Sequence, residues 1–465
     1  MQHAHHRRWP GTATIWRWHF YAGLFCIPFV LWLAITGSIY LFRPQVEALI
    51  DAPYANLPVA GPRASAADQA AAAVRAVPGS VLHRYQMPAT DREAVQIIVG
   101  KGAQETRVYV HPETLAVLKA VDEDQRLMRV IFRLHGELLA GTPGSYLVEL
   151  AASWTIVMLL SGLFLWWPRR GGLAGVVYPR LHAGGRRFWR DLHAVTGFWI
   201  SAFALFLLVS GLPWAKSWGG YLKAVRGVVE GHPVQQDWTT GRADELRQRA
   251  AADAGTRAMM GEHAEHHGMA MAHPAVSTVP LDRILATLGP LRLATPVLVS
   301  PPTGPGQPWT AKSDAANRPL RTDLTLDGET GRLLSRKDFA QRRLVDRVVG
   351  YGVAIHEGQA FGWLNQLLNL LTALGLILLA VSSVVLWWRR RPEGVLGAPR
   401  ADMPQPAALA FFALVIALGL LLPLMGISLL LVLAVERLVL VHLPGARRWL
   451  GLRPRAMVEM ARDLP

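Results

Sequence analysis

The chain has 465 residues, of which 51% are hydrophobic, with 17 tryptophans and one cysteine. Its mean hydropathy of +0.23 is too high for an ordinary soluble protein, and its length allows several domains. A single cysteine excludes an intrachain disulfide, c-type haem attachment and a cysteine-ligated iron–sulfur cluster. Any redox centre must therefore be held without covalent links, and histidine is the best ligand that the composition offers.

The net charge is +15, and most of the arginines lie beside apolar runs. The loop from Arg169 to Arg190 holds six arginines and no acidic residue, and Arg389, Arg390 and Arg391 follow a later run. Basic residues stay on the cytoplasmic side of a membrane, so this pattern places both termini in the cytoplasm. We interpret the charge as an orientation signal and not as a nucleic-acid-binding surface. Docking of an acidic flavoprotein is an alternative use of the basic loop.

Runs of about 20 apolar residues predict membrane-spanning helices. The sequence has four strong runs and a weaker hydrophobic hairpin, which predicts a multi-pass protein of the bacterial inner membrane. In chain order we expect an N-terminus and first span (1–42), a periplasmic module (43–145), a second span (146–168), a basic cytoplasmic loop (169–191), a third span (192–214), a second periplasmic module (215–362), a fourth span (363–388), a cytoplasmic linker (389–406), a transmembrane hairpin (407–442) and a cytoplasmic tail (443–465).

The two periplasmic segments repeat one α+β pattern. Each has a helix-like stretch, then alternating stretches typical of strands. The turn segments VHPETLAVL (110–118) and LDGETGRLL (326–334) align without gaps. We therefore predict a mainly α-helical membrane protein made by tandem duplication: a four-helix transmembrane core, two small periplasmic α+β modules and a C-terminal transmembrane hairpin. The helix-like stretches are 65–76 and 281–288, and the strand-like stretches include 94–99, 106–110, 295–300 and 321–326.

Histidines repeat with the same duplication. His19 and His193 each stand 17 residues before a pair of small residues, Thr36-Gly37 and Ser210-Gly211. His135 and His356 each stand 31 residues before a Trp-Trp pair. An ionisable side chain beside a membrane span is costly unless it has a function. Four histidines in two matched patterns therefore indicate two ligand pairs.

The spacing gives the depth of each pair. A helix rises about 1.5 Å per residue, which puts His19 roughly 25 Å from Thr36, near the cytoplasmic end of its span, with His193 at the same depth. Neutral imidazole is a good ligand of haem iron, and helix bundles build cofactor sites from facing side chains. We expect one haem b between His19 and His193, and a second between His135 and His356 at the outer surface. The alternative is that these are interfacial histidines copied by the duplication.

The second module contains an insertion rich in methionine and histidine at residues 256–274. Thioether and imidazole ligands together suit copper, Cu(I) in particular. A low-complexity loop with incidental metal affinity is the alternative. The candidate copper ligands are His263, His266, His267, Met269, Met271 and His273.

The sequence has no glycine-rich dinucleotide fingerprint after a strand and no P-loop. An electron-transfer function would therefore need an external donor, either a flavoprotein reductase or a quinol. Pumping driven by ATP is disfavoured.

Several short motifs together resemble a known family. They are an aromatic-flanked His19, Thr36-Gly37, R-L-H-G at 133–136, W-W-P-R-R at 166–170 and D-G-E-T-G at 327–331. Over residues 14–391 this combination resembles the PepSY-associated transmembrane family, often called the iron-regulated membrane protein family. Some members are haem-containing inner-membrane reductases of ferric siderophores.

The resemblance implies that this chain passes electrons through two haems to a ferric siderophore or another metal chelate on the periplasmic side. It does not identify a catalytic residue. A copper-linked reductase or copper-handling protein is one alternative. A non-enzymatic membrane scaffold that binds peptides or regulates proteases is another.

Overall fold

A computed structural model describes residues 12–166, 173–231, 280–303, 306–398 and 409–452. The chain divides into two compact units. The membrane unit comprises residues 1–39, 133–234 and 367–465, and the sheet unit comprises residues 40–132 and 235–366.

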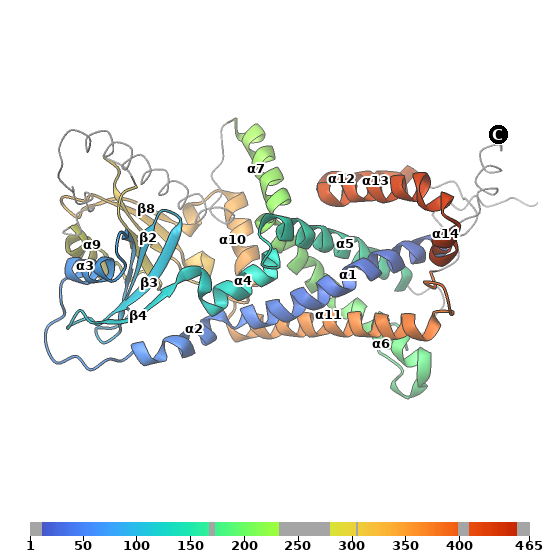
Figure 1. Ribbon diagram of the computed structural model, residues 1–465, viewed down its shortest axis with the longest axis horizontal. Helices are drawn as coiled ribbons and strands as arrows, with labels where there is room; N and C mark the ends of the chain where they lie inside the picture. The colour runs from blue at the N-terminus through green and yellow to red at the C-terminus, as the bar shows by residue number, and fades with distance from the viewer. Residues whose placement is uncertain (1–11, 167–172, 232–279, 304–305, 399–408, 453–465) are drawn as a thin grey trace, which may run out of the picture. The chain divides into compact units, whose positions relative to one another are not determined.

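Five helices in the described part are long and apolar enough to cross a membrane. Lipid offers no hydrogen bonds to the backbone, and a helix satisfies these groups internally, so apolar runs of this length form helices (Figure 1). The first four overlap the four strong apolar runs of the sequence. The five helices are α1 (Thr12–Leu41), α5 (Thr142–Trp166), α6 (Gly185–Gly211), α11 (Trp363–Arg390) and α13 (Pro423–Leu438). The 3₁₀ turn η4 (Leu212–Trp214) extends α6.

The C-terminal hairpin consists of α12 (Leu409–Leu421) and α13, and the chain reverses at Leu422 and Pro423. The two helices approach closely at Gly419 and Gly426, since a Cβ on Gly426 would lie 2.9 Å from the Gly419 carbonyl oxygen. The described part of α12 has only 13 residues, fewer than the roughly 20 that a span requires. The described residues thus provide five candidate spans where the sequence predicted six.

Polar contacts fix the hairpin to the other helices of the membrane unit. The indole of Trp154 on α5 donates a hydrogen bond to the Ser428 hydroxyl at 2.9 Å. The short helix α14 (Pro444–Leu450) follows the hairpin, and its last carbonyl, on Leu450, accepts a 2.5 Å hydrogen bond from the Tyr21 hydroxyl of α1. The indole-to-hydroxyl and hydroxyl-to-carbonyl bonds satisfy polar groups that lipid would leave without a partner.

The sheet unit contains one eight-stranded antiparallel sheet in the order β4-β3-β2-β1-β5-β6-β7-β8. The sequence predicted two separate modules, whereas the structure pairs β1 of the first with β5 of the second, with Tyr85 opposite Val299. Pairing of β1 with β5 satisfies the backbone groups at the edge strand of each module. The sequence did not predict this pairing because it produces no local sequence pattern. The strands are β1 (Val81–Met87), β2 (Val95–Lys101), β3 (Gln104–Val110), β4 (Val117–Asp122), β5 (Val297–Ser300), β6 (Trp309–Ser313), β7 (Thr322–Leu326) and β8 (Leu333–Asp338).

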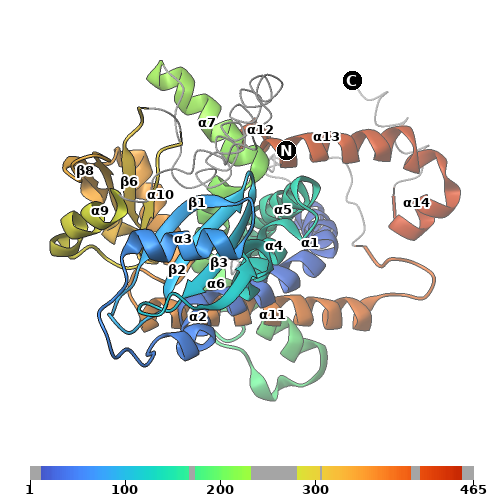
Figure 2. The same cartoon turned by 60° about the vertical axis from the view of Figure 1, so that its left-hand side comes forward.

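Two helices cover one face of this sheet and close its core. They are α3 (Ala66–Ala76) and α9 (Pro280–Leu288), and Figure 2 shows α3 lying across the strands of the first half. Ser65 caps α3 by accepting the Asp68 backbone N–H, and small alanine side chains let the helix lie close to the strands. Asp282 of α9 accepts the Ala66 backbone N–H at 2.7 Å, which ties the two halves together.

The other described helices and turns lie between these elements in the chain. The longer ones are α2 (Arg43–Asp51), α4 (Leu127–Glu137), α7 (Lys216–Glu230) and α10 (Leu344–His356). The short 3₁₀ turns are η1 (Ala52–Tyr54), η2 (Glu123–Gln125), η3 (Leu181–Ala183), η5 (Gly289–Leu291), η6 (Arg318–Leu320), η7 (Phe339–Gln341) and η8 (Leu440–His442).

The turn that occurs in both halves of the sheet unit is stabilised by different side chains, which accept hydrogen bonds from equivalent backbone N–H groups. In the first half, Nδ1 of His111 accepts the backbone N–H groups of Glu113 and Thr114, both at 3.2 Å. In the second half, the Asp327 carboxylate accepts the corresponding N–H groups of Glu329 and Thr330. The turn therefore requires an acceptor at its first position, whichever side chain supplies it.

Replacing His111 tests this requirement. His111→Ala removes the acceptor from two backbone N–H groups and should cost about 1–2 kcal/mol of stability. His111→Asn supplies an acceptor oxygen, as Asp327 does, and should retain most of the wild-type stability. The measurement is the thermal midpoint of the full chain in detergent. Equal losses in the two variants would contradict the capping role.

Candidate functional site

The first candidate site lies in the membrane unit, where His19 of α1 and His193 of α6 come together. The two imidazoles are near enough for a charge on His193 to act on His19. Both side chains are partly buried. Both histidines of the predicted inner pair thus lie in the membrane unit, and their sharing of one haem stays a prediction.

The Nδ1 atom of each ring contacts a serine on a different helix of the membrane unit. His19 Nδ1 lies 3.0 Å from the Ser161 hydroxyl of α5. His193 Nδ1 lies 3.1 Å from the Ser382 hydroxyl of α11, and 3.3 Å from both the Ser383 hydroxyl and the Leu379 carbonyl oxygen. Neither Nε2 atom hydrogen-bonds to a described residue. Each ring therefore keeps Nε2 for a ligand, and neutral imidazole Nε2 is a suitable donor to haem iron.

The serines that hold these rings were not predicted as site residues. Ser161 precedes Gly162, and a pair of small residues in a span is typical of close helix packing. A signal was nevertheless present, because Ser161 and Ser382 each stand five residues before a Trp-Trp pair. The duplication therefore repeats the supporting serine together with the histidine.

His135 of α4 shows the same kind of contact at the other end of α1. Its Nδ1 lies 3.1 Å from the Thr36 hydroxyl, which donates a 2.7 Å hydrogen bond to the Trp32 carbonyl oxygen. Its ring also lies against Gly37, where a Cβ would be 3.1 Å from Cε1. The Thr36-Gly37 pair noted in the sequence is thus the surface on which the outer histidine rests.

His356 is the last residue of α10 and belongs to the sheet unit, whereas His135 belongs to the membrane unit. The pairing of these two histidines stays a prediction. The predicted copper ligands lie in residues 232–279, outside the described residues. Among the residues that are described, no group of three or more histidine, cysteine or acidic side chains could hold a metal ion.

The second candidate site is a cavity of about 390 Å³ in the sheet unit. This volume falls in the range of small-molecule sites. The cavity lies where the two halves of the sheet meet, between α2 and the strands β1 and β2. Polar side chains that line it include Glu47, Asp51, Tyr54, Gln86, Glu93 and Gln96.

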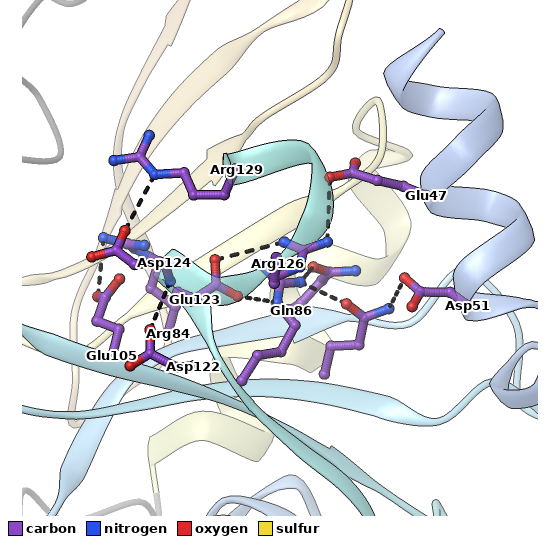
Figure 3. A network of polar contacts seen from close by, with 12 residues as sticks. Glu47, Asp51, Arg84, Gln86, Glu105, Asp122, Glu123, Asp124, Arg126 and Arg129 are labelled. Carbon is purple, nitrogen blue, oxygen red and sulfur yellow. Dashed lines mark hydrogen bonds and ion pairs between the residues drawn. The ribbon is translucent and has the colours of Figure 1, made fainter. Parts of the chain in front are cut away.

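A buried arginine holds the cavity wall in place. The Arg107 guanidinium donates to the amide oxygens of Gln86 and Gln96, at 3.0 and 2.6 Å, and pairs with the Glu123 carboxylate. Arg126 then joins Glu123 to Glu47 of α2, as Figure 3 shows. Because their amide oxygens accept hydrogen bonds from Arg107, the two glutamine side chains have fixed orientations.

A tyrosine adjoins the same network. The Tyr109 hydroxyl donates to Asp51 at 2.9 Å. Burial, reinforced by the Asp51 carboxylate, raises the pKa of the Tyr109 phenol well above its usual value. The phenol therefore remains a neutral hydrogen-bond donor across the physiological pH range.

The chain was compared with models of known protein families. A model of the PepSY-associated TM region matches residues 16–390. The chain belongs to this family. A comparison with curated proteins found no match. The matched PepSY-associated region includes all four predicted haem-ligand histidines and ends before the C-terminal hairpin.

The buried Arg107–Glu123 pair predicts a large effect of single substitutions in this PepSY-associated protein. Arg107→Met leaves the buried Glu123 carboxylate without this guanidinium and should cost about 3–5 kcal/mol. The double variant Arg107→Met with Glu123→Gln should recover most of that loss, because neither charge is then left behind. Thermal midpoints in detergent measure both effects. A double variant as unstable as the sum of the single variants would contradict the pairing.

Proposed function

We propose that this protein is an electron-transfer protein of the bacterial inner membrane that holds two haem b groups and reduces a ferric chelate at the periplasmic face. The observation that carries the proposal is the inner pair. His19 and His193 come from repeat-related helices, lie close together, and have their Nδ1 atoms occupied so that both Nε2 atoms are left for iron. A haem, when bound there, accepts and passes on one electron at a time.

The residues of the chain hold and separate the proposed centres. His19 and His193 are near the cytoplasmic end of their helices, and His135 is near the opposite end of α1. We expect His356 to complete the outer pair. Two centres at these depths would carry electrons across the bilayer by hopping. An external flavoprotein reductase or quinol would supply them, and both termini would be cytoplasmic.

The cavity of the sheet unit supports a chelate as the substrate. Its volume suits a small molecule, and its fixed glutamine amides, together with Asp51, which the Tyr109 hydroxyl holds, suit a polar ligand. The ferric chelate takes up one electron and becomes the ferrous chelate. Fe(II) carries less charge and binds hard oxygen ligands more weakly than Fe(III), so reduction releases the metal. A siderophore is the substrate that we propose.

The first experiment is a visible spectrum of the detergent-purified protein, oxidised in air and then reduced with dithionite, with haem quantified per chain. We expect two haems per chain. His19→Ala and His193→Ala should each remove the same one, because they share it, whereas His135→Ala should remove the other. His182→Ala, on η3 of the same unit, is the matched control and should keep both.

The outcome that would overturn the proposal is a folded protein without haem after expression with ample haem supply. The non-enzymatic scaffold that binds peptides or regulates proteases would then be the better interpretation. Loss of haem in the His182→Ala control would show that the histidine variants act through misfolding. Haem loss in the other variants would then have to be tested again with His19→Gln and His193→Gln.

Copper handling is the second candidate, and the Met/His-rich insertion favours it. Deleting residues 261–274 should remove tight Cu(I) binding if His263, His266, His267, Met269, Met271 and His273 form a site. The measurement is competition for Cu(I) against a chelator of known affinity. Unchanged Cu(I) affinity in the deletion variant would leave the insertion without a copper role.

A further inference from the structure

Ser161 and Ser382 occupy equivalent places in the two halves of the membrane unit. Each hydroxyl donates its proton to the backbone carbonyl three residues earlier. Ser161 bonds Met158 at 3.0 Å, and Ser382 bonds Leu379 at 3.0 Å. A hydroxyl has one proton and two lone pairs, so each serine meets its histidine with a lone pair.

The protonation of both histidines follows from these contacts. An oxygen lone pair accepts a hydrogen bond, so the Nδ1 atom facing it must carry the proton. The Leu379 carbonyl oxygen, 3.3 Å from His193 Nδ1, can only accept, which requires the same tautomer. In both rings the lone pair is therefore on Nε2.

We propose that Ser161 and Ser382 are positioning residues that fix the tautomer of His19 and His193 and set their strength as iron ligands. The inference rests on the proposed haem between these histidines. A hydrogen bond donated from Nδ1 increases the electron density of the ring, which stabilises Fe(III) relative to Fe(II). The serines therefore lower the reduction potential of the inner haem.

The two histidines are not held equally. His193 has a second hydroxyl, since Ser383 lies 3.3 Å from Nδ1 and itself donates to the Leu379 carbonyl at 2.7 Å. The first half has Gly162 at the equivalent position, where a Cβ would lie 3.1 Å from Cε1 of His19. His193 is thus the more strongly polarised ligand, and its serines have the larger effect on the potential.

The test is spectroelectrochemical titration of the purified holoprotein, together with electron paramagnetic resonance of the oxidised state. Ser161→Ala should shift the midpoint potential of the inner haem upward and change its low-spin g values. The Ser382→Ala, Ser383→Ala double variant should shift the potential further. The outer haem of the same preparation serves as the internal reference and should not change.

Matched controls separate the hydrogen bond from helix packing. Thr155 on α5 and Thr372 on α11 also donate to a carbonyl one turn back, at 2.7 and 2.8 Å, and contact neither imidazole. Thr155→Val and Thr372→Val should leave the potential unchanged. Ser161→Thr and Ser382→Thr keep the hydroxyl and should restore wild-type g values, including where the alanine variants lose haem.

Each result decides one claim. Wild-type protein without haem overturns the proposed function itself. Haem at wild-type content, with potential and g values unchanged in the alanine variants, overturns only the role of the serines. Shifts that the two valine controls reproduce, or haem loss in both the alanine and threonine variants, would assign the effect to packing and also overturn it.

Discussion

The membrane unit depends on one constraint, which is that a polar group among apolar helices must find a hydrogen-bond partner on its own helix or on a neighbouring one. An imidazole has two nitrogens, and here a hydroxyl on the adjacent helix takes one of them. Ser161 serves His19, Ser382 serves His193 and Thr36 serves His135. Since the hydroxyl is itself bonded to its own helix, ring and helix form a single rigid arrangement. In His19 and His193, Nε2 is then the part of the ring left to bind a ligand.

The duplication explains why this arrangement occurs more than once. Ser210 donates to the Phe206 carbonyl at 2.7 Å, as Thr36 donates to Trp32 in the first half. Differences between the halves show where the copies have diverged. Asp327 replaces the imidazole acceptor of His111, and Ser383 stands where the first half has Gly162. The turn keeps its backbone hydrogen bonds through the first change, whereas the second adds a hydroxyl contact that the first half lacks.

Much of this architecture could be predicted from the sequence, because spans and histidine spacing are local patterns. The spacing alone pointed to His19 and His193, and both lie in the membrane unit with Nδ1 held by a serine. The supporting serines were not predicted, because the sequence pattern of a small residue in a span is the same whether the serine allows close helix packing or accepts a hydrogen bond from a histidine. Strand β1 was missed because His83 and Arg84, both buried, interrupt its apolar alternation. The β1–β5 pairing could not be predicted, since register between distant edges is set by tertiary contacts.

The shared sheet has a consequence for how such a protein arises. Each half contributes four strands and ends at an inner edge, β1 or β5, that is complete only when the other half is present. A chain with a single copy would expose that edge and would pair with a second molecule. Fusion of two copies converts an interface between subunits into an internal one. The fused chain no longer depends on protein concentration for its assembly, and its two halves are free to acquire different ligands.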